Sequence, residues 1–311
     1  MVAGARNALE LVRLGRLGED YAAPYEIVDV GEHHRLRRYA CEGGTAVALF
    51  VPPLMVTAEV YDVAPDVSAV SALAARGIVP YVVDFGAPER ETGGMKRTLD
   101  DHVRAVVRCV ERARALSGKD VHLLGYSQGG MFCYQAAAYL RSEGIRSLVT
   151  FGSPVDIHKG LPGVRSDLLG AFVRAIEPAV TQVVDRVEGL PGELTSTAFK
   201  LVSTRKEIQQ RLDFLRLLHD RSALERREAR RRFLGGEGFV AWPGPAFRAF
   251  VDDFIVHNRM LSGGFVIDGR TVTLADITCP ILAFVGTTDE IARPASVRAI
   301  ADAAPSAYVR M

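Results

Sequence analysis

Cysteine is scarce in this sequence, and neither sign of charge is in clear excess. The four cysteines, Cys41, Cys109, Cys133 and Cys279, are scattered and lack the spacing of metal ligands. We expect Cys109 and Cys133, which fall in predicted helices, to be reduced buried thiols. The formal net charge of +1 gives no electrostatic basis for binding nucleic acid. The composition therefore predicts no metal centre and no nucleic-acid partner.

Long apolar runs are also missing. No uninterrupted apolar stretch approaches the length that crosses a bilayer, so we expect no transmembrane segment. Glu10, Glu19 and Asp20 interrupt the N-terminal segment, which therefore lacks the pattern of a signal peptide. These absences predict a cytoplasmic protein. The chain of 311 residues is 48% hydrophobic and 24% charged, which suits one large α/β domain, or a core with an inserted subdomain.

Short apolar runs alternate with longer helical patterns from Thr45 onward. This alternation predicts parallel strands joined by right-handed crossovers, hence a mostly parallel sheet with helices on both faces. The predicted strands are 46–51, 78–83, 121–124, 147–151 and 281–285. The predicted helices are 7–18, 68–76, 99–116, 128–142 and 295–303.

The alternation stops between about residues 162 and 250, where the composition is mostly helical. We expect residues 162–250 to form an inserted cap over a core made of 45–161 and 251–311, preceded by an N-terminal helix and approach segment at 1–44. The run Arg226-Arg227-Glu228-Ala229-Arg230-Arg231-Arg232 favours a solvated helix face, with an anionic-ligand patch as the alternative. Residues 307–310 read as the last core strand, so we expect the core to continue beyond Met311.

A serine stands at the centre of Gly125-Tyr126-Ser127-Gln128-Gly129, directly after the apolar run 121–124. The flanking glycines let a strand turn sharply into a helix, with Ser127 exposed at the apex. A hydroxyl placed there is a candidate nucleophile, and the backbone N–H of Gln128 is a candidate oxyanion donor. The alternative is a strand–helix turn without chemistry.

A serine nucleophile needs an orienting carboxylate, which in this arrangement follows a late strand. Asp289 fits, because it lies in a Gly-Thr-Thr-Asp turn after the strand 281–285; an ordinary turn is the alternative. The second oxyanion donor is expected after the first core strand. Pro52 and Pro53 have no N–H, so Leu54 or Met55 would supply it, unless the prolines only end the strand.

The general base is the missing element. The sequence holds seven histidines, none of them after Asp289, where this arrangement requires one. We expect His102 and His122 to be structural, and we keep His158 and His257 as possible substitutes. The first expectation is that the catalytic histidine lies downstream of Met311.

Several segments beyond the serine motif resemble polyhydroxyalkanoate synthases in sequence and order, over roughly residues 45–295. The matching segments are Val51-Pro52-Pro53-Leu54-Met55-Val56, Tyr61-Asp62-Val63, Val83-Asp84-Phe85-Gly86, Thr98-Leu99-Asp100-Asp101, Leu123-Leu124-Gly125-Tyr126-Ser127-Gln128-Gly129-Gly130, Phe151-Gly152-Ser153-Pro154-Val155-Asp156, Val256-His257-Asn258-Arg259 and Gly286-Thr287-Thr288-Asp289-Glu290-Ile291. The resemblance implies an α/β-hydrolase core with a cap, and acyl transfer from hydroxyacyl-CoA thioesters through a covalent acyl-enzyme.

One position departs from that family. The synthases carry cysteine where this chain has Ser127, and a serine ester is usually resolved by water rather than by exchange. We therefore expect a serine hydrolase or acyltransferase for lipid-like acyl esters or acyl-CoA thioesters, with no cofactor. Polymer synthesis is one alternative, and a non-catalytic acyl-binding module fused to a larger protein is another. The acyl chain length, the acceptor and the oligomeric state stay open.

Overall fold

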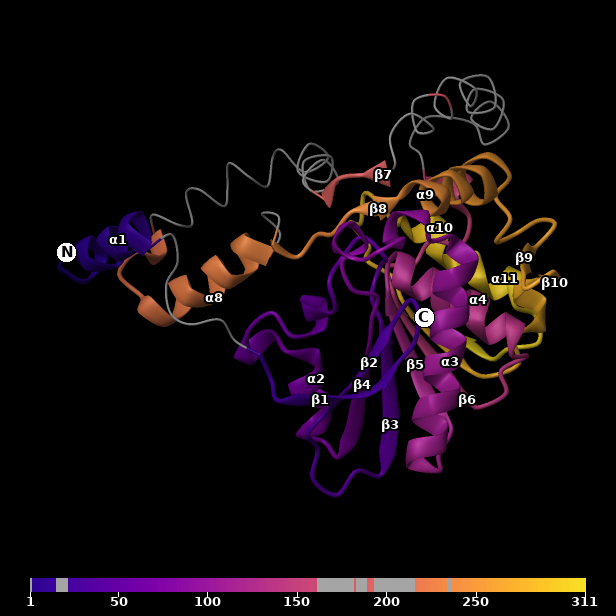
Figure 1. The fold of residues 1–311 in the computed structure, drawn as a ribbon, viewed down its shortest axis with the longest axis horizontal. Coiled ribbons are helices and arrows are strands. Elements are labelled where there is room, and N and C mark those ends of the chain that lie inside the picture. The colour runs from indigo at the N-terminus through magenta and orange to yellow at the C-terminus, as the bar shows by residue number, and fades with distance from the viewer. Residues whose placement is uncertain (1, 15–21, 161–181, 183–188, 193–215, 234–236) are drawn as a thin grey trace.

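An eight-stranded sheet forms the centre of the computed structural model, which describes residues 2–14, 22–160, 182, 189–192, 216–233 and 237–311 (Figure 1). The strand order is β1-β2-β4-β3-β5-β6-β11-β12. The strand bounds are β1 Tyr25–Val30, β2 Arg35–Tyr39, β3 Ala46–Val51, β4 Ile78–Asp84, β5 Val121–Tyr126, β6 Ile145–Phe151, β11 Ile281–Phe284 and β12 Val309–Arg310.

The strands from β4 to β12 run parallel, as the alternating sequence pattern predicts. The register sets Val51 of β3 opposite Gly125 of β5. It also sets Phe151 of β6 opposite both Tyr126 of β5 and Phe284 of β11. The carboxyl ends of these four strands therefore meet at one edge of the sheet, directly before the residues singled out from the sequence.

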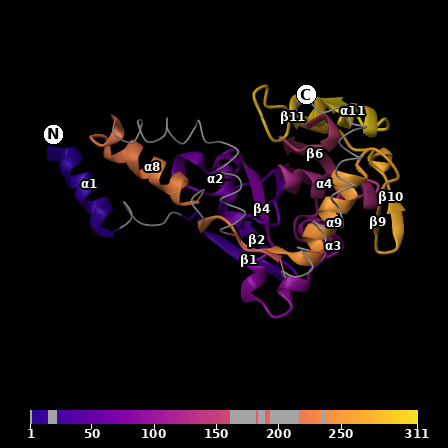
Figure 2. The same cartoon turned by 90° about the horizontal axis from the view of Figure 1, so that it is seen from above.

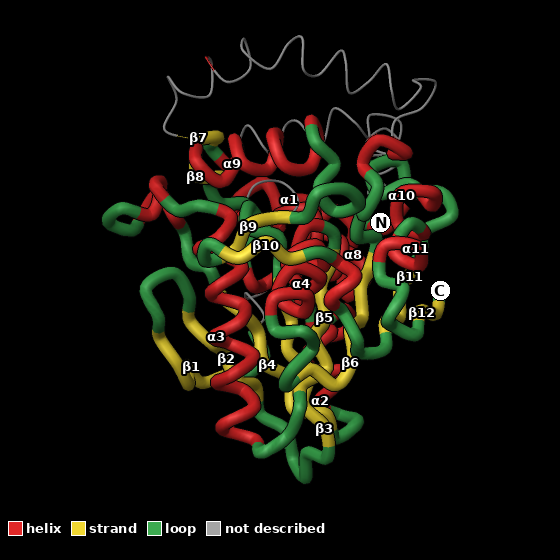
Figure 3. Tube along the Cα trace, turned by 90° about the vertical axis from the view of Figure 1, so that its right-hand side faces the viewer, coloured by secondary structure: helices red, strands yellow, loops and turns green. Residues whose placement is uncertain are grey.

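Side chains of β3 alternate between the two faces of the sheet. Val47, Leu49 and Val51 pack into the core beside the helices α3 (Leu99–Ser117) and α4 (Gln128–Tyr139), which lie together on one face (Figure 3). Ala48 and Phe50 belong to the core on the other face, with α2 (Ala69–Ala74). The residues of β3 are apolar on both sides of the strand, so both faces are covered. This pattern is typical of a buried parallel strand.

Most predicted helices are present, with changes at their ends. Helix α3 begins with a capping box between Thr98 and Asp101 and stops at Gly118, whose φ is 68°. Helix α4 ends three residues before the predicted Ser142, because Arg141 and Ser142 have φ values of 50° and 62°. The predicted helix 295–303 is two short helices, α10 (Pro294–Arg298) and α11 (Ile300–Ala303).

The sequence analysis missed the antiparallel hairpin of β1 and β2 within the approach segment. Strand β2 pairs antiparallel with β4, so the hairpin extends the sheet at one edge. Arg37 of β2 is buried and forms ion pairs with Asp84 of β4 and with Glu59. Burial alone would raise the pKa of Asp84, but the charge and hydrogen bonds of Arg37 hold it below its ordinary value.

Most of the predicted cap, residues 162–250, lies outside the described residues, so the division into core and cap stays a prediction. The arginine-rich run falls in helix α8 (Arg221–Arg232), which lies beside α1 (Val2–Leu14) and away from the main sheet (Figures 1 and 2). Arg221 binds Glu10 through two nitrogens and joins the two helices. Residues 15–18 of the predicted N-terminal helix lie outside the described residues.

The short strand β7 (Gly189–Leu190) comes before α8 and pairs with β8. Between α8 and β11 lie β8 Trp242–Pro243, α9 Gly244–Phe250, a π-helical turn Val251–Val256, β9 Phe265–Ile267 and β10 Arg270–Val272. None of the described helices combines the length and apolar character that crossing a bilayer requires.

Candidate active site

Ser127 occupies the sharp turn between β5 and α4. Its backbone is left-handed, with φ of 53° and ψ of −122°, a conformation that costs energy for any residue with a Cβ. Its N–H donates to the Phe151 carbonyl at 2.9 Å, which fixes the turn against β6. The structure therefore has the strand–turn–helix geometry expected of this motif.

Small residues make this turn possible. A Cβ at Gly125 would lie 2.5 Å from Gly130, and a Cβ at Gly129 would overlap the carbonyl oxygen of Val51. The glycine at 129 thus lets the start of α4 approach the end of β3. That approach brings the expected oxyanion donors on the two elements together.

The Ser127 side chain is not used to cap the helix that it precedes. Serine is a common N-cap because its oxygen accepts a backbone N–H of the first turn, yet Ser127 makes no such bond. Among the described residues, no hydrogen bond to its Oγ is present. The partly exposed hydroxyl therefore stands at the positive end of a helix with its oxygen free.

Asp289 lies at the same edge of the sheet, in the turn that follows β11. Its Oδ1 accepts the N–H groups of Ile291 and Ala292, each at 2.9 Å, so one carboxylate oxygen holds the turn. Its Oδ2 lies beside Gly152, which follows β6 and whose N–H donates to the Phe284 carbonyl. Because β6 lies between β5 and β11, only one strand separates the turns that carry Ser127 and Asp289.

The electrostatics of the edge agree with this placement. Partial burial raises the pKa of Tyr126, and the negative charge of Asp289 raises it further. Tyr126 precedes Ser127 directly, so the Asp289 carboxylate acts on the phenol of the residue next to Ser127.

The predicted oxyanion residues lie where β3 ends. Leu54 and Met55 are buried, and the Leu54 N–H donates to Oε1 of the Gln128 side chain at 3.2 Å. The Met55 carbonyl accepts the N–H of Val240 at 3.1 Å, so a segment near the end of the expected cap covers this loop. The side chain of Gln128 thus connects two residues that the sequence analysis considered only for their backbone groups.

Tyr61 was given no role in the sequence analysis, although it lies in one of the segments quoted there. Its hydroxyl donates to the Val51 carbonyl at 2.6 Å and accepts the Tyr126 N–H at 3.1 Å. It therefore connects the end of β3 to the nucleophile turn. No local pattern reveals this, because the partners are ten and 65 residues away in the sequence.

None of the seven histidines, all within the described ranges, is hydrogen-bonded to Ser127 or Asp289. His158 bonds the Ile255 carbonyl through Nε2 at 2.7 Å, and His257 bonds the Asp252 carbonyl through Nδ1 at 3.0 Å. His102 is fully buried against the Thr98 carbonyl, and desolvation lowers its pKa to about 4. His122 bonds Ser147. The two possible substitutes are thus engaged elsewhere.

Thiol and metal chemistry find no support in the described part of the chain. All four cysteines are free, and burial raises the pKa values of Cys109 and Cys133 well above the ordinary thiol value. Such buried thiols are poor nucleophiles because they stay protonated. Within the described ranges, no three His, Cys, Asp or Glu side chains gather as metal ligands would.

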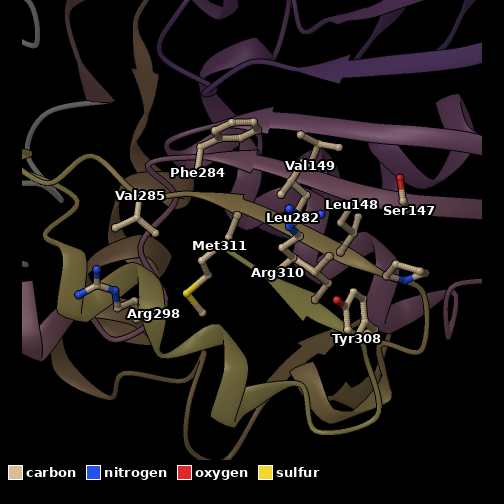
Figure 4. Close-up of a pocket in the computed structure, with 13 residues that line it drawn as sticks. Ser147, Leu148, Val149, Leu282, Phe284, Val285, Arg298, Tyr308, Arg310 and Met311 are labelled. Atoms are coloured by element: carbon tan, nitrogen blue, oxygen red, sulfur yellow. The ribbon is translucent and has the colours of Figure 1, made fainter.

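An open groove of about 740 Å³ lies on the sheet face beside β12. Figure 4 shows Phe284, Leu282 and Met311 among the side chains that line it, with Arg298 and Tyr308 at its margins. The stacked rings of Phe151 and Phe284 lie at the end of the neighbouring strands. None of the predicted site residues lines this groove, so it is distinct from the edge that carries Ser127.

Comparison with known proteins gives three findings. The model of the alpha/beta hydrolase fold family matches residues 70–311. The chain is 33% identical over 277 residues to the poly(3-hydroxyalkanoate) polymerase subunit PhaC of Allochromatium vinosum. The aligned region covers 85% of this chain and 74% of that protein. It is 28% identical over 246 residues to the corresponding subunit of Thiocystis violacea. The aligned region covers 77% of this chain and 65%, just under two thirds, of that protein.

A solved structure adds the fold. The monoacylglycerol lipase of Paleococcus ferrophilus superposes with a TM-score of 0.52 at 15% identity, over 89% of this chain and 87% of the lipase. At that identity the likeness is one of fold only.

Proposed function

Because this chain belongs to the alpha/beta hydrolase fold family, and within it to the poly(3-hydroxyalkanoate) polymerase subunits, we propose that it transfers or hydrolyses acyl groups through an acyl-enzyme on Ser127. The proposed substrates are lipid-like acyl esters or acyl-CoA thioesters. The observation that carries the proposal is the left-handed Ser127, whose hydroxyl caps no helix and accepts no hydrogen bond within the described chain. A strained backbone is typical of functional sites, and neither the strain nor the free side-chain oxygen stabilises the turn.

The first step forms a bond between Ser127 Oγ and the substrate carbonyl carbon while a base takes the hydroxyl proton. The carbonyl oxygen becomes an oxyanion, and the amides of Gln128 and Met55 stabilise it, because the Leu54 N–H already donates to the Gln128 side chain. Collapse of this intermediate breaks the bond to the alcohol or to the CoA sulfur, and the leaving group takes the proton from the base. Water then attacks the ester on Ser127 and releases the free acid.

Serine favours water as the final acceptor. A thioester on cysteine exchanges readily with another thiol or alcohol, whereas an oxygen ester on serine is more resistant. Polyester synthesis is the second candidate, because the curated relatives are polymerase subunits. The two differ in product: hydroxyacyl-CoA yields free hydroxy acid and CoA in one case, and polymer with CoA in the other.

The proposal needs a proton acceptor for Ser127. Among the described residues, none of the seven histidines is hydrogen-bonded to Ser127, so we propose a histidine other than these seven as the base. Asp289 would orient that histidine from the neighbouring turn.

Imidazole in solution tests the whole arrangement, because it can replace a missing histidine ring. A fluorophosphonate probe should label wild-type protein at Ser127, and added imidazole should accelerate the labelling by at least about tenfold. The S127A variant corrects for any reaction that imidazole causes elsewhere. Labelling equal in wild type and S127A, with and without imidazole, would reject the enzyme and favour a module that only binds acyl groups.

A further inference from the structure

One peptide unit in the loop after β3 has no hydrogen bonds. It joins Leu54 to Met55, and in the described part of the chain neither the Leu54 carbonyl nor the Met55 N–H has a hydrogen-bond partner. Both residues are buried. Backbone polar groups of buried residues are nearly always paired, so a free N–H in this loop is available to a ligand.

The peptide unit before it is bonded at both ends. The Leu54 N–H donates to Oε1 of the Gln128 side chain at 3.2 Å. The Pro53 carbonyl accepts the Val56 N–H at 3.1 Å and so closes a tight turn. Of these two bonds, only the one to Gln128 comes from a side chain.

The peptide unit after it is also bonded at both ends. The Met55 carbonyl accepts the Val240 N–H at 3.1 Å, and the Val56 N–H is the donor that closes the turn. The next N–H, of Thr57, donates to the Gly238 carbonyl at 2.9 Å, so the loop pairs with a distant segment of the chain. Because both neighbouring units are held, the Met55 N–H keeps one direction.

Gln128 is placed to serve both expected oxyanion donors. Its own N–H follows Ser127 directly and opens α4, where a helix has no internal partner for it. Its side chain reaches the loop because Gly129, which has no Cβ, lets the helix approach the backbone of Pro52. The orientation of the side-chain amide follows from the bond to Leu54, since the reverse orientation would set two donors against each other.

An amide side chain is a costly choice for this buried position. The Gln128 residue is only 5% exposed, and its Nε2 has no hydrogen-bond partner in the described chain. A buried donor without a partner lowers stability. The one hydrogen bond of this side chain in the described chain is that to Leu54, so glutamine is explained by what it does for the loop.

We propose that Gln128 is a positioning residue for the second oxyanion donor. Its side chain takes the Leu54 N–H and holds the loop, so that the Met55 N–H and the backbone N–H of Gln128 itself face the same oxyanion. This inference rests on the acyl-enzyme function proposed above. The Gln128 side chain acts through the loop and does not touch the substrate.

The test is Q128L, which removes the acceptor oxygen and keeps a side chain of similar size. Without its partner the Leu54 N–H no longer holds the loop, and the Met55 N–H loses its fixed direction. The maximal rate of imidazole-supported fluorophosphonate labelling should fall by about 10- to 100-fold. The probe concentration for half-maximal rate should change by less than about threefold, because ground-state binding is not altered.

Q135L is the matched control. Gln135 lies about two turns later in α4, is equally buried, and its Oε1 has no hydrogen-bond partner in the described chain. Q135L therefore makes the same chemical change in the same helix without releasing the loop. It should label within about threefold of the wild-type rate. A loss in Q135L as large as that in Q128L would assign the effect to damage of α4 and overturn the positioning role.

Amide hydrogen exchange gives a readout independent of chemistry. Exchange of the Leu54 N–H should be at least about tenfold faster in Q128L than in wild type and Q135L, while the Thr57 N–H should be unchanged in all three. Unchanged exchange at Leu54, or Q128L labelling within about threefold of wild type, would overturn the proposal. If wild-type Ser127 does not react at all, the proposed function fails, and exchange at Leu54 alone then decides whether Gln128 holds the loop.

Discussion

The carboxylate oxygen Oδ2 of Asp289 lies beside Gly152, so closely that a Cβ at residue 152 would be 3.1 Å away. The other oxygen, Oδ1, is held by two backbone N–H groups of its own turn. One oxygen is thus structural, and the other faces the end of the strand beside the nucleophile turn. Because only one of its oxygens is used by the turn, the Asp289 carboxylate can stabilise its own loop and still orient a base.

Replacing Asp289 by asparagine tests that division. D289N retains an oxygen for the turn but loses the charge, so the fold should persist while imidazole-supported labelling of Ser127 falls by at least about tenfold. The measurement is the labelling rate beside a thermal unfolding curve. D268N removes an exposed acid in the β9–β10 turn and should leave both unchanged. Equal rates for D289N and wild type would remove Asp289 from the mechanism.

Replacing Ser127 by cysteine should change the chemistry without changing the fold. A thiol at this helix N-terminus has a lowered pKa, and its thiolate exchanges with thioesters without a strong base. We expect S127C to accumulate a covalent hydroxyacyl adduct from hydroxyacyl-CoA at pH 8, detected as a mass increase of the intact protein. S127A reports any reaction of the native cysteines, of which Cys109 and Cys133 are buried and protonated. Adduct formation in S127A equal to that in S127C would contradict the assignment.

The close approach of Gly129 to β3 predicts a large effect of one methyl group. In G129A the new Cβ would overlap the Val51 carbonyl, so we expect a loss of about 3 kcal/mol in unfolding free energy and no labelling of Ser127. G118A is the control: Gly118 has a positive φ, unlike Gly129, but no atom lies within 4 Å of a Cβ there. It should lose only about 1 kcal/mol in urea unfolding and keep its reactivity. A G129A protein as stable and reactive as G118A would show that the turn can shift away from β3.

His102 predicts a specific dependence of stability on pH. Desolvation lowers its pKa to about 4 in the folded state, while the unfolded value is about 6.5, so the unfolded chain binds one more proton between these values. The stabilisation is complete above about pH 6.5 and is lost as the pH falls toward 4. Between pH 7 and pH 5 the wild type should lose about 2 kcal/mol from this group.

H102L measures that contribution, because leucine cannot take up the proton. Its unfolding free energy should fall less than that of wild type between pH 7 and pH 5, by about 2 kcal/mol. His34 and His122, whose pKa values are also lowered by burial, contribute equally in both proteins and cancel. Parallel pH profiles for H102L and wild type would mean that His102 is protonated in the folded protein.

Local sequence was sufficient for the core strands and for the nucleophile turn. Five apolar runs became β3, β4, β5, β6 and β11, because a buried parallel strand leaves a continuous apolar signal. The glycines around Ser127 give an equally local signal for the turn. Chain order predicted an acid in a turn after a late strand, and Asp289 lies in such a turn after β11; its role as the orienting acid stays a prediction.

Other features need the folded chain. Strand β1 has mostly exposed residues, and β2 carries three arginines, so this hairpin lacks the apolar pattern by which strands are recognised. The role of Arg37 is visible only in the folded chain, where it donates to Asp84, 47 residues later in the sequence. Tyr61 and the Gln128 side chain act through hydrogen bonds to backbone groups of other strands, and no spacing rule encodes such partners.

The backbone at Ser127 owes its shape to the glycines around it and to Val51 and Phe151, not to the hydroxyl, which bonds to nothing in the described chain. Exchanging oxygen for sulfur at that position is therefore a change of one element in an unchanged scaffold. On the proposed mechanism, the fate of an acyl group on residue 127 (release to water or addition to a growing chain) then depends on the leaving ability of a single atom.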